Sequence, residues 1–156
     1  MKRSIIFVML MLIGAFGFGQ DKIVIESKLE PLMLKFVNDG IERGYNPMPK
    51  ILKNIDSVLI DPKLQYPILG YYNPKNKSIH IASFTLIDFL ILRTTLYHVL
   101  THGITLNNGH VCYKCGDIMS ASSPQTFAIY AIKERWDLEV DKLFTLIKEE
   151  EKKKIK

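Results

Sequence analysis

Three of the four histidines in this 156-residue chain, His98, His102 and His110, fall within thirteen residues. Side chains four residues apart on an α-helix lie one above the other, so His98 and His102 can direct two imidazoles at one point. Tetrahedral Zn²⁺ requires this geometry of its first two ligands, and three histidines would leave one coordination position open. A lone histidine on an apolar helix is more often a hydrogen-bonded core residue, but this spacing and clustering predict a zinc site.

The histidine pair lies at the end of a long apolar segment. We predict a buried helix from about Phe84 to His102, with Ser83 as its N-cap. Asp88 and Arg93 interrupt the apolar residues and make the segment too polar for a membrane span. Gly103 comes directly after the pair and is expected to end the helix, so that the chain turns back with the third histidine.

The segments upstream of this helix carry one β-prone and one helical pattern. Lys22 to Ile25 is β-prone, and apolar residues then recur at helical spacing from Leu29 to Ile41. Ser27 and Glu30 form a capping-box pattern that predicts the start of that helix, and Gly44 predicts its end.

A loop with two prolines over Tyr45 to Pro49 leads into further β-prone segments. Ser57 to Ile60 is predicted to be a strand. Ile68 to Tyr72 and Ser78 to Ala82 are predicted to form a hairpin, because the Asn-Pro pair in the linking residues 73–77 favours a turn.

The C-terminal third is expected to be irregular and then helical. Thr105 to Ser122 contains glycines and asparagines, while Ser123-Pro124 starts a last helix whose apolar residues recur every three or four positions to Ile147. The order helix, strands, long helix, loop and helix predicts one α+β domain with a short mixed sheet.

The first 19 residues are predicted to be a secretory signal peptide, which leaves residues 20–156 as the domain. Lys2 and Arg3 give a basic start, and the apolar run from Ile5 to Phe18 is too short to span a bilayer. We therefore expect a periplasmic or secreted protein with no stable membrane anchor after cleavage. Removing the two basic residues lowers the net charge from +5 to +3 (5 − 2), a bias too weak to predict nucleic acid as a partner.

Cys112 and Cys115 are open to three interpretations. In an oxidising compartment the Cys-x-x-Cys pair is expected to form a small disulfide. Combined with His98 and His102 it would instead make a closed Cys₂His₂ structural zinc site, with no open position and no catalysis. A redox role lacks the βαβ context that a thioredoxin-like interpretation requires.

The sequence around the histidines resembles the zincin metallopeptidases of the metzincin type. Residues 97–103, YHVLTHG, then His110, then DIMS at residues 117–120, are similar to H-E-x-x-H on a long helix, a third histidine and a Met-turn. The resemblance implies that His98, His102 and His110 bind zinc above Met119. It also implies that residues 69–72 form an edge strand that pairs with an extended peptide or protein ligand.

Two positions depart from the metzincin pattern. His110 lies twelve residues after His98 instead of ten, and Thr105 occupies the glycine position. Val99 stands where the catalytic glutamate is expected, and a valine can neither take a proton from water nor deliver it to the leaving amine. We therefore expect a pseudoenzyme in which peptide hydrolysis is lost or strongly impaired. The alternative is a non-catalytic peptide-binding or protein-binding module on the same scaffold.

Four other polar residues have simpler interpretations. Asp117 is expected to cap a turn rather than replace the missing base. Glu134 and Glu139 are expected to be solvated or paired on the outer face of the last helix. His80 is predicted to be structural, with no partner evident in the sequence.

Overall fold

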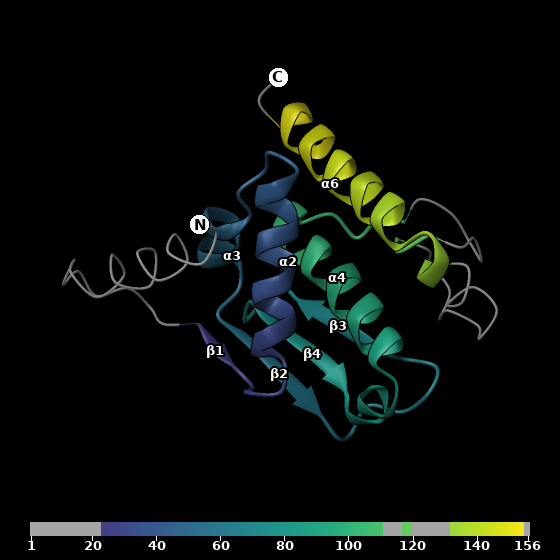
Figure 1. The fold of residues 1–156 in the computed structure, drawn as a ribbon. Coiled ribbons are helices and arrows are strands. Elements are labelled where there is room, and N and C mark those ends of the chain that lie inside the picture. The colour runs from purple at the N-terminus through teal and green to yellow at the C-terminus, as the bar shows by residue number, and fades with distance from the viewer. Residues whose placement is uncertain (1–22, 111–116, 120–131, 155–156) are drawn as a thin grey trace, which may run out of the picture.

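The computed structural model describes residues 23–110, 117–119 and 132–154. The elements are, in chain order, β1 (Val24–Ile25), α2 (Glu30–Glu42), α3 (Met48–Asn54), β2 (Ser57–Asp61), β3 (Gly70–Asn73), β4 (Ser78–Ala82), the 3₁₀ helix η1 (Ser83–Ile87), α4 (Phe89–Thr105) and α6 (Trp136–Lys153). Helices α2 and α4 lie over one face of a mixed sheet (Figure 1). The predicted α+β class is therefore confirmed.

The sheet has the strand order β1-β2-β4-β3. β1 and β2 run parallel, as do β2 and β4, whereas β3 is antiparallel to β4 with Gly70 opposite Ile81. The predicted hairpin is confirmed, and Asn73 accepts a hydrogen bond from the Lys75 amide at its turn. β3 consequently forms an edge of the sheet.

The first helix has the predicted apolar face, but its predicted cap is wrong. α2 begins at Glu30, and no side chain caps its N-terminus. Ser27 lies in the turn that precedes the helix, where the Leu29 amide donates to the Glu26 carbonyl at 2.7 Å. The predicted end is confirmed, because α2 stops at Glu42 and Gly44 has a φ of +69°.

Helix α3 replaces part of the predicted loop. Pro47 is its N-cap and Pro49 lies in its first turn, where a missing amide hydrogen costs nothing. The two prolines that suggested a loop therefore start a helix. Asn54, at its end, donates to the carbonyls of Gly103 and Ile104 and so fixes α3 to α4.

Helix α4 starts later than the sequence predicted. Residues 83–87 form the separate η1 turn, and the cap is Asp88 rather than Ser83. The Asp88 carboxylate accepts from the amides of Leu90 and Ile91 at 2.8 and 3.1 Å. An ionised cap suits the positive end of the helix dipole better than a hydroxyl.

Helix α4 also ends later than predicted. Gly103 lies inside the helix, which continues to Thr105 and ends at Leu106 in the left-handed region with φ +51°. A Cβ on Gly103 would lie 3.0 Å from the Ile55 side chain, so the glycine lets the last turn of α4 approach Ile55 closely. The predicted reversal of the chain occurs three residues later than expected.

The last helix is interrupted. Its predicted start at Ser123-Pro124 lies outside the described residues. Ile132 to Glu134 are helical, and Arg135, with φ −119°, separates them from α6. Val140, Leu143 and Ile147 are buried, as their spacing predicted, and Phe144 is buried as well.

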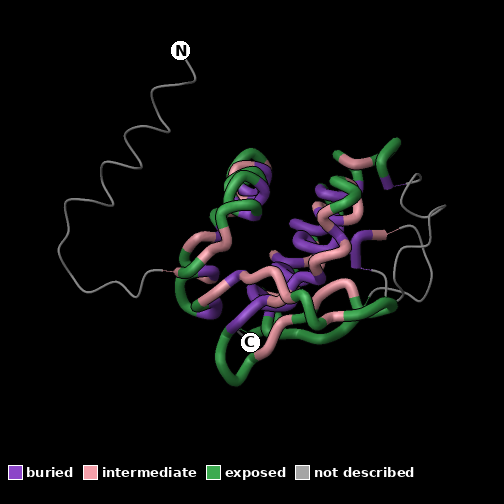
Figure 2. Tube along the Cα trace, turned by 90° about the horizontal axis from the view of Figure 1, so that it is seen from below, coloured by how far each residue is buried: buried purple, intermediate pink, exposed green. Residues whose placement is uncertain are grey.

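The core lies between the sheet and the helices (Figure 2). Phe36 of α2 contacts Tyr97 of α4 and Phe144 of α6 at ring-centroid distances of 5.0 and 5.1 Å. The Arg93 guanidinium also stacks over the Trp136 ring at 3.5 Å, which joins α4 to α6. These contacts fix the helix that carries the histidine pair.

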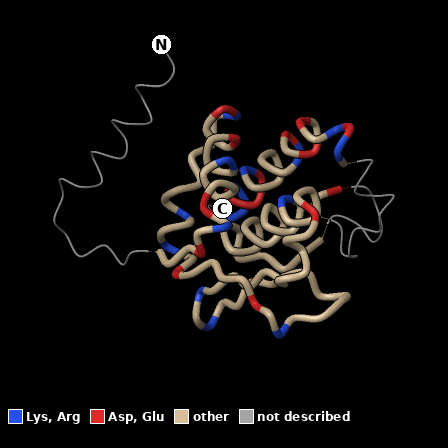
Figure 3. Tube along the Cα trace, turned by 60° about the horizontal axis from the view of Figure 1, so that its bottom comes forward, with Lys and Arg blue, Asp and Glu red and all other residues tan. Residues whose placement is uncertain are grey.

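The surface charges of the helices are mixed in sign. Figure 3 shows acidic and basic residues next to one another at the helix ends. Arg43 pairs with Asp141 at 2.5 Å, and Tyr45 donates to Glu151 at 2.8 Å, so these polar contacts tie the end of α2 to α6. Among the helices of the described ranges, none has both the length and the apolar character of a bilayer-spanning segment.

Candidate metal centre

The structure brings the three predicted histidines together. His98 and His102 project from successive turns of α4, and His110 comes from the loop that follows it. One ring nitrogen of each lies within 4.8 Å of the others. The His98 and His102 Nε2 atoms are 2.9 Å apart, and the ring centroid of His110 lies 5.1 and 5.0 Å from theirs. Three histidines close enough to hold a metal ion are therefore present.

Two backbone carbonyls fix the orientation of the helical histidines. His98 Nδ1 lies 2.7 Å from the Ile118 carbonyl oxygen, and His102 Nδ1 lies 2.6 Å from that of Asn107. A carbonyl oxygen can only accept, so each Nδ1 must carry the hydrogen. Each neutral imidazole then has its Nε2 lone pair free, which is the state of a metal-ligating histidine with its second nitrogen hydrogen-bonded.

The facing Nε2 atoms are close enough to share one positive centre. Two lone pairs at 2.9 Å repel unless a proton or a cation lies between them. Two nitrogens at 2.0–2.1 Å from a tetrahedral zinc are about 3.3 Å apart, so a small opening of the rings accommodates the ion. The donor set of His98, His102 and His110 therefore fits zinc.

Burial opposes protonation of this pair. Burial lowers the pKa of His98 to about 4, the hydrogen bond to Ile118 partly offsets that effect, and the nearby His102 and His110 lower it further. Burial also lowers the pKa of His102. His110 is exposed. The cluster thus has one buried histidine, His102, one half-buried histidine, His98, and one side open to solvent at His110.

The metal-free protein should lose stability in acid. His98 binds a proton at pH 6.5 when unfolded and only at about pH 4 when folded, so the unfolded state holds more protons between these values. The free energy of unfolding should therefore fall by about 3 kcal/mol as the pH drops through this window. Urea unfolding with a chelator present measures it. His98→Gln should show a flatter dependence, and equal slopes in both proteins would contradict the expectation.

The turn at residues 117–119 lies against His98. Its Ile118 carbonyl is the acceptor for His98, and Asp117 accepts a hydrogen bond from the Met119 amide at 2.9 Å. Asp117 therefore caps the turn, as predicted. Met119 is buried in the hydrophobic core, 2% exposed.

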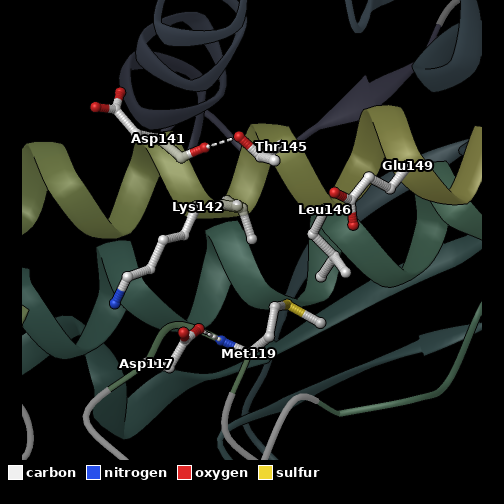
Figure 4. A pocket seen from close by; sticks show the side chains of 8 residues that line it. Asp117, Met119, Asp141, Lys142, Thr145, Leu146 and Glu149 are labelled. Carbon is white, nitrogen blue, oxygen red and sulfur yellow. Dashed lines mark hydrogen bonds between the residues drawn. The ribbon is translucent and has the colours of Figure 1, made fainter.

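An open pocket of about 380 Å³ lies between this turn and α6. Figure 4 shows Asp117 and Met119 opposite the side chains of α6 that line the pocket. The remaining lining residues belong to α6: Asp141, Lys142, Leu143, Thr145, Leu146 and Glu149. None of the three histidines lines it, so the pocket is separate from the metal centre.

Four further residues have the following positions. Val99 is 1% exposed and belongs to the core. Glu139 is paired, which is one of the two predicted alternatives, because it accepts from Lys142 at 2.8 Å, but its predicted position on the outer face is wrong, since it is fully buried. Cys112 and Cys115 lie outside the described residues.

His80 has partners that the sequence did not reveal. Its Nε2 lies 2.8 Å from Ser78 Oγ and its Nδ1 3.3 Å from Asp61, while the Tyr71 ring stacks on it at 4.8 Å. The order serine, histidine, aspartate resembles a nucleophilic triad. However, Ser78 is 3% exposed and donates its hydrogen to Asn76 at 2.6 Å, so no substrate reaches it. These contacts are structural, as predicted for His80.

Sequence reasoning missed the carbonyls of Asn107 and Ile118. Backbone acceptors carry no signal in the residue type. The run Asn107-Asn108-Gly109 was the available indication of a tight turn beside the helix end. Comparisons of the chain with protein-family models, curated proteins and solved structures found no match.

Proposed function

We propose that this chain is an exported zinc-binding protein on the metallopeptidase plan, with His98, His102 and His110 as the ligands. The observation that supports this most is the pair of Nε2 atoms 2.9 Å apart, each on a ring whose Nδ1 is committed to a backbone carbonyl. Burial keeps the pair neutral and able to bind a metal. The solvent-exposed His110 leaves a side from which water or a ligand approaches.

Efficient peptide hydrolysis is not part of the proposal. When bound, zinc would supply Lewis-acid activation of water. The residue that should accept the proton is Val99, which has no proton acceptor. Asp117, the nearest alternative in the sequence, holds the Met119 amide. The site therefore retains the ligands of a hydrolase without its general base.

A peptide-binding role is the second candidate function, and the sheet supplies the observation that favours it. β3 is an edge strand, so one side of its backbone has no strand partner among the residues that the structure describes. An extended peptide can add to such an edge through backbone hydrogen bonds. Its partner would be a peptide or protein segment that is bound and recovered intact.

Zinc content tests the proposal directly. We expect elemental analysis of the protein from residue 20, purified without chelator, to find about one zinc per molecule. His98→Ala should abolish it, because two histidines cannot hold the ion as three do. His80→Ala, which removes a histidine outside the cluster, should leave it unchanged. Zinc absent from the wild-type protein, or retained in His98→Ala, would contradict the proposal.

A further inference from the structure

The loop between α4 and His110 is organised by one side chain. Asn107 directly follows Leu106, whose left-handed conformation ends α4. The side-chain amide nitrogen of Asn107 donates to Glu150 of α6 at 3.0 Å. The side-chain amide oxygen of Asn107 accepts from the Gly109 backbone N–H at 2.8 Å. Asn107 therefore connects the helix end, the following turn and α6.

The same residue touches both sides of the histidine cluster. The Asn107 carbonyl fixes His102 through the 2.6 Å contact to Nδ1. The side chain holds Gly109, the residue immediately before His110. The backbone of Asn107 thus orients one ligand, and its side chain sets the path of the chain to another.

We propose that Asn107 is the positioning residue that brings His102 and His110 to a common point. The proposal rests on the proposed metal site. Without the amide side chain, the Gly109 backbone loses its acceptor and His110 is no longer directed at the helix. The Asn107 carbonyl also loses the anchor to Glu150 that keeps it aimed at His102.

The end of α6 takes part in this arrangement. Lys154 donates to the Thr105 carbonyl at the end of α4, and Lys153 pairs with Glu150 at 2.7 Å. The hydrogen bonds from Lys153 and then from Asn107 hold the pKa of Glu150 below its usual value, so the carboxylate stays ionised and accepts well. Helix α6 therefore acts as a support for the loop without supplying a ligand.

The test compares metal affinity in the full-length protein from residue 20. Zinc affinity is measured by competition with a chromogenic chelator, and the ligand geometry by the visible absorption of the Co²⁺ form. We expect Asn107→Ala to weaken zinc binding on the order of tenfold, in the range found for partners that orient metal ligands. The Co²⁺ spectrum should change as His110 withdraws.

Asn46→Ala is the matched control. Asn46 also accepts a backbone amide two residues on, that of Met48 at 3.1 Å, but it lies before α3. The Asn46→Ala variant should have the zinc affinity and the Co²⁺ spectrum of the wild type. Asn107→Asp keeps the acceptor for Gly109 but cannot donate to Glu150. Its zinc affinity should therefore lie between those of Asn107→Ala and the wild type. This variant replaces Asn107→Ala if the alanine variant does not fold.

The possible results distinguish a failure of the Asn107 proposal from a failure of the proposed metal site. Wild-type protein that binds no zinc overturns the metal site and this inference together. Wild-type protein that binds zinc, with Asn107 variants of equal affinity and spectrum, overturns this inference alone. A lower melting temperature of the Asn107 variants without loss of affinity also overturns it, because that is the result of a purely structural role.

Discussion

Replacing Val99 by glutamate is expected to raise zinc-dependent peptide hydrolysis by about 10²- to 10⁴-fold over the wild-type chain, the usual contribution of a positioned general base. The introduced carboxylate lies one residue after His98, the position that the H-E-x-x-H motif gives its base. Val99 is 1% exposed, so burial should raise the pKa of the new carboxyl towards the working pH.

This substitution carries a cost in stability. A carboxylate placed in the core loses its hydration, which destabilises the fold by several kcal/mol unless it finds a partner. The assay should therefore use excess zinc and a temperature well below the melting transition. Cleavage of a self-quenched fluorescent casein, with and without chelator, measures the rate.

Val99→Gln provides the control for that experiment. Glutamine has nearly the same size and burial but no basic group. If Val99→Glu is no faster than Val99→Gln while both hold one zinc, position 99 does not face the substrate and descent from a hydrolase loses its support. A faster glutamate variant whose activity survives chelation would contradict the role of the metal.

Removing the Asp39 side chain is expected to destabilise the protein by about 1–3 kcal/mol, the cost of leaving a buried hydrogen-bonding group without its partner. Asp39 is 3% exposed and accepts from Tyr97 at 2.7 Å, from Lys35, and at longer range from Arg43. Asp39→Ala would leave the buried Tyr97 hydroxyl without its acceptor. Urea unfolding at neutral pH measures the loss.

An exposed aspartate gives the comparison for Asp39. Asp56 pairs with Lys77 at 4.0 Å, and its side chain is 57% exposed, so Asp56→Ala should cost less than about 1 kcal/mol. The double variant Asp39→Ala/Tyr97→Phe should lose less free energy of unfolding than the sum of the two single variants, because the two residues share one hydrogen bond. Strict additivity, or equal losses at the two aspartates, would contradict this account.

The sequence was most informative where its pattern was long or its turn chemistry specific. The apolar run before His102 predicted a buried helix, and the Asn-Pro pair at residues 73–74 predicted the hairpin. Both follow from local residue preferences that the packing reinforces. The histidine spacing was equally reliable, because only helical geometry at that spacing brings positions 98 and 102 together.

The errors arose where two residues competed for one role. Ser83 and Asp88 are both good N-caps, and the carboxylate five residues later is the one that accepts two amides. Glycine is typical of the end of a helix, which is why Gly103 suggested one. Its close contact with Ile55 instead requires a glycine inside the helix. A pattern along the chain contains no information on Ile55, so these choices depend on tertiary packing.

Glu139 illustrates the same limit for charge. Its position on an amphipathic helix suggested a solvated or paired side chain on the outer face. It does pair with Lys142 and Arg135 of the same helix segment, but it is fully buried. Such pairs on one helix are visible in the sequence. The sequence does not show whether another part of the chain covers such a pair.

The support of the histidine loop by α6 also has a consequence for biosynthesis. Glu150 lies 48 residues after His102 (150 − 102), and the carbonyl of Ile118 that orients His98 also comes later in the chain. During translation, the two helical histidines are therefore synthesised before either support. If the proposed metal site is correct, its full affinity should be acquired only when the C-terminal helix has docked, which would couple capture of the ion to a late step of folding.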